Sequence, residues 1–290
     1  MKHSTKIAAA AVVLLLLPAA ALPSKAGKIV TDSLESKILG TEIKFNVYLP
    51  ESFGKTDTQY PVVYLLHGLS DDYTTWKERG NMQFVADELM RSGEAREMII
   101  VMPGAGSADV HHTHSGYFNV PGWNYEDFFF NEFIPEVESR YRVISDKGHR
   151  AIMGLSMGGG GSTAYCQKHP DKFSSCYAMS AWLDNKSNAV SAPEEEKDCL
   201  YLTCESVKQN SALDFLDRAD EATLEKLRSV KWFFDCGDDD FLFDLSVELH
   251  KKMRKAGVKD ELRIRDGVHN WEYWHLALRM ALPFASRNFY

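Results

Sequence analysis

Three residue types, in a fixed order along the chain, could together carry out covalent catalysis on an acyl carbon. Ser156 lies between glycines in Gly154-Leu155-Ser156-Met157-Gly158, aspartates follow at 238–240, and His269 lies near the C-terminus. A serine hydroxyl is a weak nucleophile until a base takes its proton, and an acid must orient that base. The order serine, acid, histidine therefore predicts a nucleophile, its orienting acid and its base.

The serine lies in the local context that this chemistry needs. The apolar run Arg150-Ala151-Ile152-Met153 predicts a strand before it, and a helix-like stretch follows as far as His169, where Pro170 disfavours helix. A strand, a sharp turn and a helix around G-x-S-x-G form a nucleophile elbow, which exposes the hydroxyl at the end of a sheet. The alternative is a glycine-rich turn in an unrelated α/β protein.

The acid and the base are expected in turns that follow later strands. Asp240 is the first choice for the acid, from its Gly-x-x-Asp-x-Leu spacing in Gly237–Leu242, with Asp239 and Asp238 as alternatives. An aspartate there could instead only favour a helix N-terminus. His269 falls between the last predicted strand and the last predicted helix, whereas His275 falls inside that helix and is the weaker candidate.

Backbone amides are the expected donors to a developing oxyanion. The amide after the serine belongs to Met157, and a second is expected from Leu69, in the turn that follows the strand 61–66. The alternative interpretation is that this turn only ends a strand and has no catalytic role. His111, His112 and His114 could suggest a metal site, but a polar loop explains them better. The serine mechanism requires neither a metal nor an organic cofactor.

Apolar runs alternate with helical stretches, which predicts a mostly parallel sheet with helices on both faces, an α/β fold in one domain. The expected strands are 43–49, 61–66, 98–102, 151–153, 174–179, 231–235 and 262–264. The expected helices are 126–141, a second around Leu245, Leu249 and Met253 that stops at Gly257, and a last one capped by Asn270.

Residues 183–226 interrupt this alternation, because they are polar and only patchily periodic. They predict a cap that contacts substrate, with an ordinary surface excursion as the alternative. Aromatic residues could form a surface for an acyl group or a sugar, although each could equally belong to the core. These candidates are Trp76, Tyr117, Trp123, Trp182 and Phe241.

The N-terminus resembles an export signal. Lys2 and Lys6 precede the apolar stretch 7–17, and Ser24-Lys25-Ala26 offers a cleavage site. The prediction is a signal peptide at 1–26 and a mature secreted or periplasmic domain at 27–290, with an uncleaved anchor as the alternative. A net charge of −8 before cleavage argues against nucleic acid or an anionic membrane as a partner.

The five cysteines leave at least one thiol unpaired in a monomer. Cys199 and Cys204 could form a disulfide in an oxidising compartment, and five free buried thiols are the alternative. The oligomeric state stays open.

Six stretches together resemble the putative-esterase family of α/β-hydrolases, which includes feruloyl esterases, esterase D and carbohydrate esterase family 1. They are YLLHG at 64–68, MIIVMP at 98–103, YEDFFFNEFIPEVESRYR at 125–142, RAIMGLSMGGGG at 150–161, GDDDFL at 237–242 and HNW at 269–271. The resemblance implies an α/β-hydrolase fold with Ser156 as nucleophile, Asp240 as acid, His269 as base, and Leu69 and Met157 as oxyanion donors.

The expected function is therefore that of an exported serine carboxylesterase without a cofactor. The resemblance implies feruloyl or acetyl esters of plant polysaccharides or their fragments as substrates. The alternatives are acyl transfer of the mycolyltransferase type, hydrolysis of S-formylglutathione or of a siderophore ester, and a non-catalytic carbohydrate-binding module.

Overall fold

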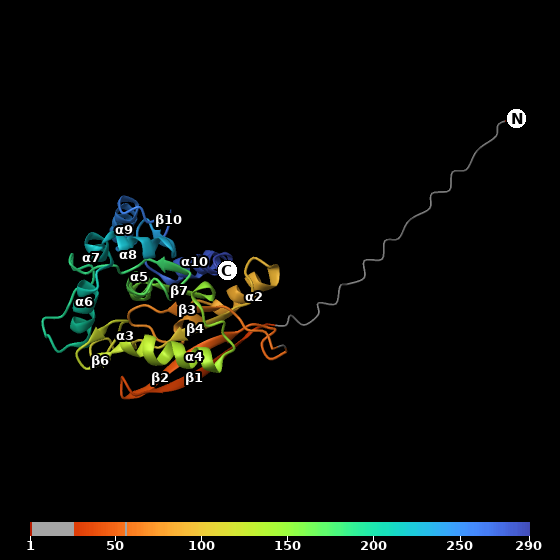
Figure 1. Cartoon of the computed structure of the whole chain (residues 1–290), viewed down its shortest axis with the longest axis horizontal. Coiled ribbons are helices and arrows are strands. Elements are labelled where there is room, and N and C mark those ends of the chain that lie inside the picture. Colours follow the sequence, from red (N-terminus) through yellow and green to blue (C-terminus); the bar gives the residue numbers. More distant parts are fainter. Residues whose placement is uncertain (2–25, 56) are drawn as a thin grey trace.

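The protein is built around one eight-stranded sheet with the order β1-β2-β4-β3-β7-β8-β9-β10. The computed structural model describes Met1 and residues 26–55 and 57–290, so the predicted signal peptide lies almost wholly outside the described residues. β1 pairs antiparallel with β2, and β2 with β4, whereas β4, β3, β7, β8, β9 and β10 pair in parallel in that order. In Figure 1, β1 and β2 form one end of the sheet and β10 lies at the other.

The strands of this sheet are β1 (Lys28–Ser36), β2 (Thr41–Leu49), β3 (Val62–Leu66), β4 (Ile99–Pro103), β7 (Arg150–Leu155), β8 (Ser175–Met179), β9 (Lys231–Gly237) and β10 (Asp260–Arg265). A small hairpin pairs β5 (Asn119–Val120) with β6 (Trp123–Asn124). The helices are α1 (Thr75–Glu78), α2 (Met82–Ser92), α3 (Tyr125–Phe128), α4 (Ile134–Arg140), α5 (Met157–Lys168), α6 (Cys199–Gln209), α7 (Ala212–Arg218), α8 (Glu221–Arg228), α9 (Phe243–Lys255) and α10 (Trp271–Arg287).

Two apolar cores lie on the two faces of the sheet. Along β3, Val62, Tyr64 and Leu66 belong to the core that includes side chains of α3 to α7 and α9. Val63 and Leu65 point to the opposite core, with side chains of α2 and α10. Because successive residues of a strand face opposite sides, a strand buried on both faces is apolar throughout. The predicted fold class, a mostly parallel sheet between helical layers, is confirmed.

The predicted single helix over 126–141 is wrong in its details. The chain forms α3, then a π-helical stretch at Phe129–Phe133, then α4, and Tyr141 lies beyond the last turn. Pro135 is the physical reason, because its ring would collide with the carbonyl four residues earlier in a regular α-helix. That carbonyl belongs to Asn131, inside the wider π turn, where the clash is relieved.

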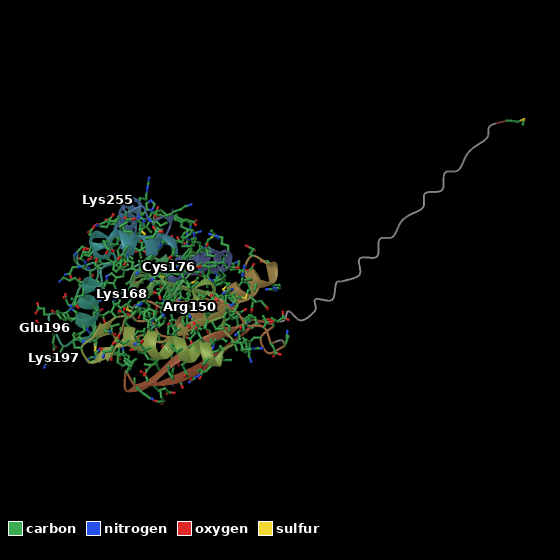
Figure 2. The ribbon with its side chains drawn as sticks, viewed as in Figure 1. Arg150, Lys168, Cys176, Glu196, Lys197 and Lys255 are labelled. Atoms are coloured by element: carbon green, nitrogen blue, oxygen red, sulfur yellow. The ribbon has the colours of Figure 1, made fainter. Side chains whose placement is uncertain are left out.

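Residues 183–226 contain more regular structure than their sequence pattern indicated. An irregular stretch leads into α6, α7 and most of α8, and α7 packs against α5 and α9. Glu196 and Lys197, in the irregular stretch, project from the edge of the molecule in Figure 2. The predicted helix boundaries at Gly257 and Asn270 are confirmed, since Gly257 has φ +67° and the Asn270 side chain accepts a hydrogen bond from the Tyr273 amide.

All five cysteines are free and buried, so Cys199 and Cys204 do not form the disulfide that was one of the two alternatives. In the part of the chain that the structure describes, the helices are all too short or too polar to cross a membrane.

A buried ion pair joins α4 to β7 beneath the sheet. Arg150, labelled in Figure 2, donates to both carboxylate oxygens of Glu138 at 2.6 and 2.8 Å, and both side chains are under a tenth exposed. The Tyr64 hydroxyl also donates to Glu138, at 3.2 Å. Removing one partner of such a pair leaves an uncompensated buried charge, which is far more costly than removing both.

We therefore expect Arg150→Met to lower the free energy of unfolding by about 3 to 5 kcal/mol, measured by urea denaturation. The double variant Arg150→Met/Glu138→Gln also removes the unpaired charge of the Glu138 carboxylate and still offers the Tyr64 hydroxyl an acceptor. It should therefore recover more than half of the lost free energy of unfolding. A single variant as stable as the wild type would contradict the importance of this pair.

Candidate active site

Ser156 occupies a strained turn between β7 and α5. Its backbone has φ +52° and ψ −118°, a conformation that side-chain-bearing residues rarely adopt. The neighbouring glycines make the turn possible, because a Cβ on Gly154 would lie 2.5 Å from the Gly158 carbonyl oxygen. A Cβ on Gly158 would lie 2.6 Å from that of His67. The Ser156 amide donates to the Met179 carbonyl at 2.8 Å, which ties the turn to β8.

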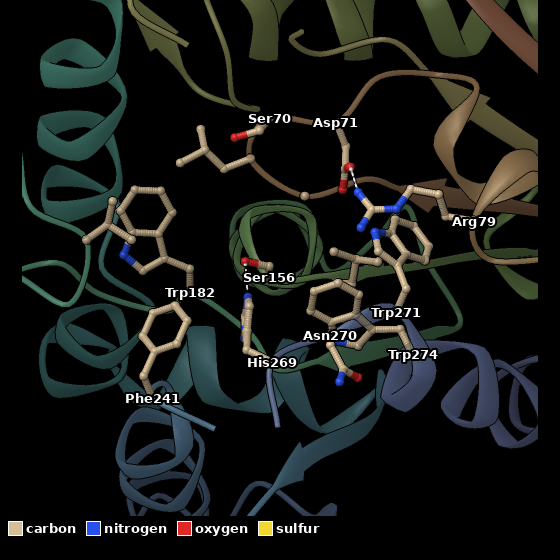
Figure 3. A pocket seen from close by; sticks show the side chains of 14 residues that line it. Ser70, Asp71, Arg79, Ser156, Trp182, Phe241, His269, Asn270, Trp271 and Trp274 are labelled. Carbon is tan, nitrogen blue, oxygen red and sulfur yellow. Dashed lines mark hydrogen bonds and ion pairs between the residues drawn. The ribbon is translucent and has the colours of Figure 1, made fainter. Parts of the chain in front are cut away.

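The structure brings Ser156, His269 and Asp240 together, and Figure 3 shows the contact between the first two. His269 Nε2 lies 2.9 Å from Ser156 Oγ, and His269 Nδ1 lies 2.9 and 3.0 Å from the two carboxylate oxygens of Asp240. Because a carboxylate only accepts, the proton of the neutral ring lies on Nδ1. The unprotonated Nε2 then faces the serine hydroxyl as an acceptor.

Asp240 is buried in a setting that keeps it ionised. Burial raises the pKa of its carboxyl, but the hydrogen bond and charge of His269 and the Leu242 amide outweigh burial, so the pKa lies below its usual value. Ser180 also hydrogen-bonds this carboxylate, and its hydroxyl accepts from the Trp274 indole at 3.0 Å. Ser180 follows β8 with φ +46°, and its position at a strand end is the signal in the sequence that could have revealed it.

The alternative candidates for acid and base lie elsewhere. Asp238 and Asp239 are exposed, and Asp238 accepts a hydrogen bond from the Gly267 amide at 3.0 Å. His275 bonds the Gly80 carbonyl through Nδ1 at 2.9 Å. The side chains of Asp238 and His275 therefore stabilise turns, and Asp239 bonds the Gly267 carbonyl through its backbone amide at 3.1 Å.

The turn after β3 is held by a buried histidine. His67 Nε2 lies 2.9 Å from the Ala105 amide, which can only donate, so the ring proton is on Nδ1, 2.8 Å from the Gly68 carbonyl oxygen. The Asp71 amide donates to the same oxygen at 3.3 Å. The Gly68 carbonyl and the Leu69 amide belong to the same peptide group, and the C=O and N–H of a trans peptide point in opposite directions. Because the carbonyl points toward the His67 ring, the Leu69 N–H points away from it.

His67 has no room for a second ring proton. Burial lowers its pKa to about 4, and a proton on Nε2 would face the Ala105 N–H. The turn that carries Leu69 is therefore held by a neutral imidazole.

An open cavity of about 340 Å³ lies in front of Ser156. Its lining residues are Gly68, Leu69, Ser70, Asp71, Arg79, Leu155, Ser156, Trp182, Val190, Phe241, His269, Asn270, Trp271 and Trp274. Of the five aromatic candidates, Trp182 and Phe241 line this cavity. Trp76 and Tyr117 are buried and bond the carbonyls of Leu66 and His67, and Trp123 stacks on His114.

Two charged residues of the cavity wall, Asp71 and Arg79, did not emerge from sequence reasoning. Asp71 is 8% exposed, and Arg79 Nη1 lies 3.6 Å from its carboxylate (Figure 3). Burial raises the pKa of Asp71 to about 6 against the opposing effect of Arg79. Asp71 comes three residues after Gly68, so its position in the turn that follows a central strand was the available signal.

The three loop histidines do not gather around one point. His111 contacts Asp198, His112 contacts Asp109, and His114 stacks on the Trp123 ring. Across the described ranges 26–55 and 57–290, no group of three or more His, Cys, Asp or Glu side chains is arranged to hold a metal ion.

One known protein family matches most of this chain. A family model described as putative esterase matches residues 36–285. The chain belongs to the putative-esterase family. This membership places it among the carboxylic-ester hydrolases, and the alternative of a non-catalytic binding module is not retained.

Individual relatives of this esterase include a solved ferulic acid esterase. That structure is 48% identical, with a TM-score of 0.88, and the match covers 91% of this chain and 99% of that one. An endo-1,4-beta-xylanase/feruloyl esterase of Xylanibacter ruminicola is 31% identical over 53% of this chain and 20% of its own length. A diacylglycerol acyltransferase/mycolyltransferase of Mycobacterium leprae is 30% identical over 77% of this chain and 74% of its own. The esterase thus spans only a fifth of the first of these two curated relatives.

Acid should destabilise this esterase partly through His67. In the unfolded chain the imidazole has its ordinary pKa of 6.5, whereas in the folded protein the value is about 4. Between these values the unfolded state binds more protons, so stability present above pH 6.5 is lost as the pH falls toward 4, by up to about 3 kcal/mol.

The measurement is the free energy of unfolding of wild type and His67→Gln across this pH range. Every other titratable group is common to both proteins, so the difference between their pH profiles isolates the imidazole. Parallel profiles would contradict a neutral, buried His67.

Proposed function

We propose that this protein is an exported serine carboxylesterase that hydrolyses feruloyl esters of plant polysaccharides or their fragments, with Ser156 as nucleophile, His269 as base and Asp240 as orienting acid. The observation that carries the proposal is the chain of short contacts from Ser156 Oγ through His269 to Asp240, at the floor of an open cavity. A nucleophile, a base and an orienting acid in contact are the minimal set for acyl transfer through a serine ester.

The first half of the reaction forms an acyl-enzyme. Ser156 Oγ attacks the ester carbonyl carbon as its proton passes to His269 Nε2, and the carbonyl oxygen becomes an oxyanion. The oxyanion collapses, the bond to the alcohol oxygen breaks, and His269 gives its proton to that oxygen. Asp240, ionised and bonded to Nδ1, stabilises the imidazolium that exists between these two transfers.

The second half releases the acid. Water replaces the alcohol, loses a proton to His269 Nε2 and attacks the acyl carbon, and the proton then returns to Ser156 Oγ as its ester bond breaks. Two amides are suited to stabilise both oxyanions. Met157 N–H is at the N-terminus of α5, where helical amides lack partners, and Leu69 lies in the turn held by His67 and lines the cavity.

The walls of the cavity support an aromatic acyl group. Trp182, which is almost fully buried, and Phe241, whose ring lies 4.5 Å from that of His269, provide apolar surface beside the nucleophile. The relatedness to a solved ferulic acid esterase points to the same acyl class. An acetyl ester would leave this surface uncovered, so acetyl esters are the second choice.

Residues 183–226 act as a cap in this proposal, since Val190 from this stretch lines the cavity next to Trp182. Export rests on the signal-like N-terminus at 1–26 and places the enzyme where plant polysaccharides are found. Mass spectrometry of the exported protein should find Gly27 as its first residue.

The decisive experiment compares methyl ferulate with a short acetyl ester, for wild type and Ser156→Ala. We expect wild type to hydrolyse methyl ferulate with the higher kcat/KM and Ser156→Ala to lose about 10³-fold or more, because no other group supplies the attacking oxygen. Hydrolysis of the acetyl ester alone would change the proposed substrates from feruloyl to acetyl esters. Activity that survives in Ser156→Ala would refute the mechanism.

The three neighbouring aspartates offer a matched test of the acid. Asp240→Asn should lower kcat by about 10³- to 10⁴-fold, because an amide no longer selects the correct tautomer or stabilises the imidazolium. Asp238→Asn and Asp239→Asn remove the same charge from exposed positions, and each should stay within about threefold of wild type. A larger loss in either control than in Asp240→Asn would overturn the assignment.

Acyl transfer to a sugar hydroxyl is the second candidate, favoured by the relatedness to a mycolyltransferase. The same atoms would serve, with the hydroxyl in place of water. Incubation with methyl ferulate and a free sugar, followed by separation of the products, distinguishes a new sugar ester from free ferulate.

A further inference from the structure

The cavity in front of Ser156 has two chemically different walls (Figure 3). On one side lie Trp182 and Phe241, which are aromatic and uncharged, and on the other lie Asp71 and Arg79 beside Trp271. The serine and His269 lie between the two sides. An ester substrate also has two sides, the acyl group and the alcohol, and the two must lie on opposite sides of the attacked carbon.

The charged wall lies close to the nucleophile. A Cβ built on Gly68 would be 3.1 Å from an Asp71 carboxylate oxygen and 3.6 Å from Ser156 Cβ, so the carboxylate and the serine border the same point in space. A negative charge there repels a developing oxyanion, so Asp71 does not assist the chemical step directly. Its remaining chemical capacity is to accept hydrogen bonds from donors on the substrate.

Asp71 has acceptor capacity beyond the hydrogen bond that its carboxylate receives from the Gly68 amide. Its ion pair with Arg79 is longer than a hydrogen bond, at 3.6 Å, and among the described residues no other cation lies within ion-pair distance. The Arg79 side chain is 61% exposed, and its guanidinium lies 5.3 Å from the centre of the Trp271 ring. This wall thus combines acceptors, donors and an apolar indole next to the ester bond.

We propose that Asp71 and Arg79, with Trp271, form the subsite for the sugar that leaves as the alcohol. The inference rests on the proposed function and deepens it. A sugar carries hydroxyls on the carbons next to the ester oxygen, within reach of a carboxylate that borders Ser156. The phenolic hydroxyl of a feruloyl group, in contrast, lies at the far end of the ring from the carbonyl carbon. The acyl group then occupies the wall of Trp182 and Phe241.

The test compares two esters of the same acid, methyl ferulate and a feruloyl ester of arabinose, which differ only in the alcohol. Asp71→Ala should lower kcat/KM for the arabinose ester by about 10- to 100-fold, mainly through KM, because a hydrogen bond to a charged group is lost. The kcat/KM for methyl ferulate should stay within about threefold. Arg79→Gln, at a mostly exposed position that folding tolerates, should show the same selective loss.

Glu78→Gln is the matched control, since it removes an exposed charge from the residue next to Arg79, outside the cavity lining. It should hydrolyse both esters like wild type. Equal losses on both esters in Asp71→Ala and Arg79→Gln, or a loss confined to methyl ferulate, would overturn the sugar subsite while leaving the proposed esterase function intact. If wild type hydrolyses neither ester, the proposed function fails, and this inference fails with it.

Discussion

The structure depends on one backbone constraint, the strained positive-φ conformation of Ser156 where β7 meets α5. This turn is stable only because the chain can approach itself closely at Gly154 and Gly158, and because Ser156 is bonded on both sides. Its amide donates to Met179 at the end of β8, and its carbonyl accepts from Trp182 and Gly160. The strain of the turn is thus borne by two central strands and a helix. In the proposed mechanism, this fixed backbone sets the position from which the Ser156 hydroxyl attacks.

The other groups reach the serine because parallel strands end at the same edge of a sheet. β3 leads into the turn of Leu69, Ser180 directly follows β8, β9 ends three residues before Asp240, and β10 leads to His269. β9 and β10 are neighbours in the sheet, which brings acid and base together although 29 residues separate them along the chain. Beneath them the buried Asp235 bonds Tyr177, Arg263 and Tyr273, so strand β10 and the start of α10 are fixed to the core on both sides of the loop that carries His269.

Sequence reasoning identified the central strands because they are apolar on both faces, and it placed Ser156, the aspartate turn and His269 through the order of strands and turns. It could not choose among Asp238, Asp239 and Asp240 on physical grounds, because burial separates them and burial depends on the packing of distant elements. It missed β1, whose edge position leaves a half-exposed mixture without a clear period. It missed the π-helical turn, which follows from a clash between Pro135 and Asn131 in three dimensions. Asp71 and Arg79 escaped because their significance arises from facing the same cavity as Ser156.

The two walls of the cavity are constrained to different degrees by the fold. Asp71 follows directly on the turn that holds Leu69, and Trp271 is the first residue of α10, two residues after His269. A change of chain length or backbone conformation on that side therefore moves the turn of Leu69 or the loop of His269. Val190, on the opposite side, belongs to a stretch without regular structure between β8 and α6, which can change length or composition while the sheet keeps its register. Under the proposed assignment of the two walls, the choice of acyl group can vary through residues 183–198, whereas the recognition of the alcohol is linked to the elements that carry His269 and Leu69.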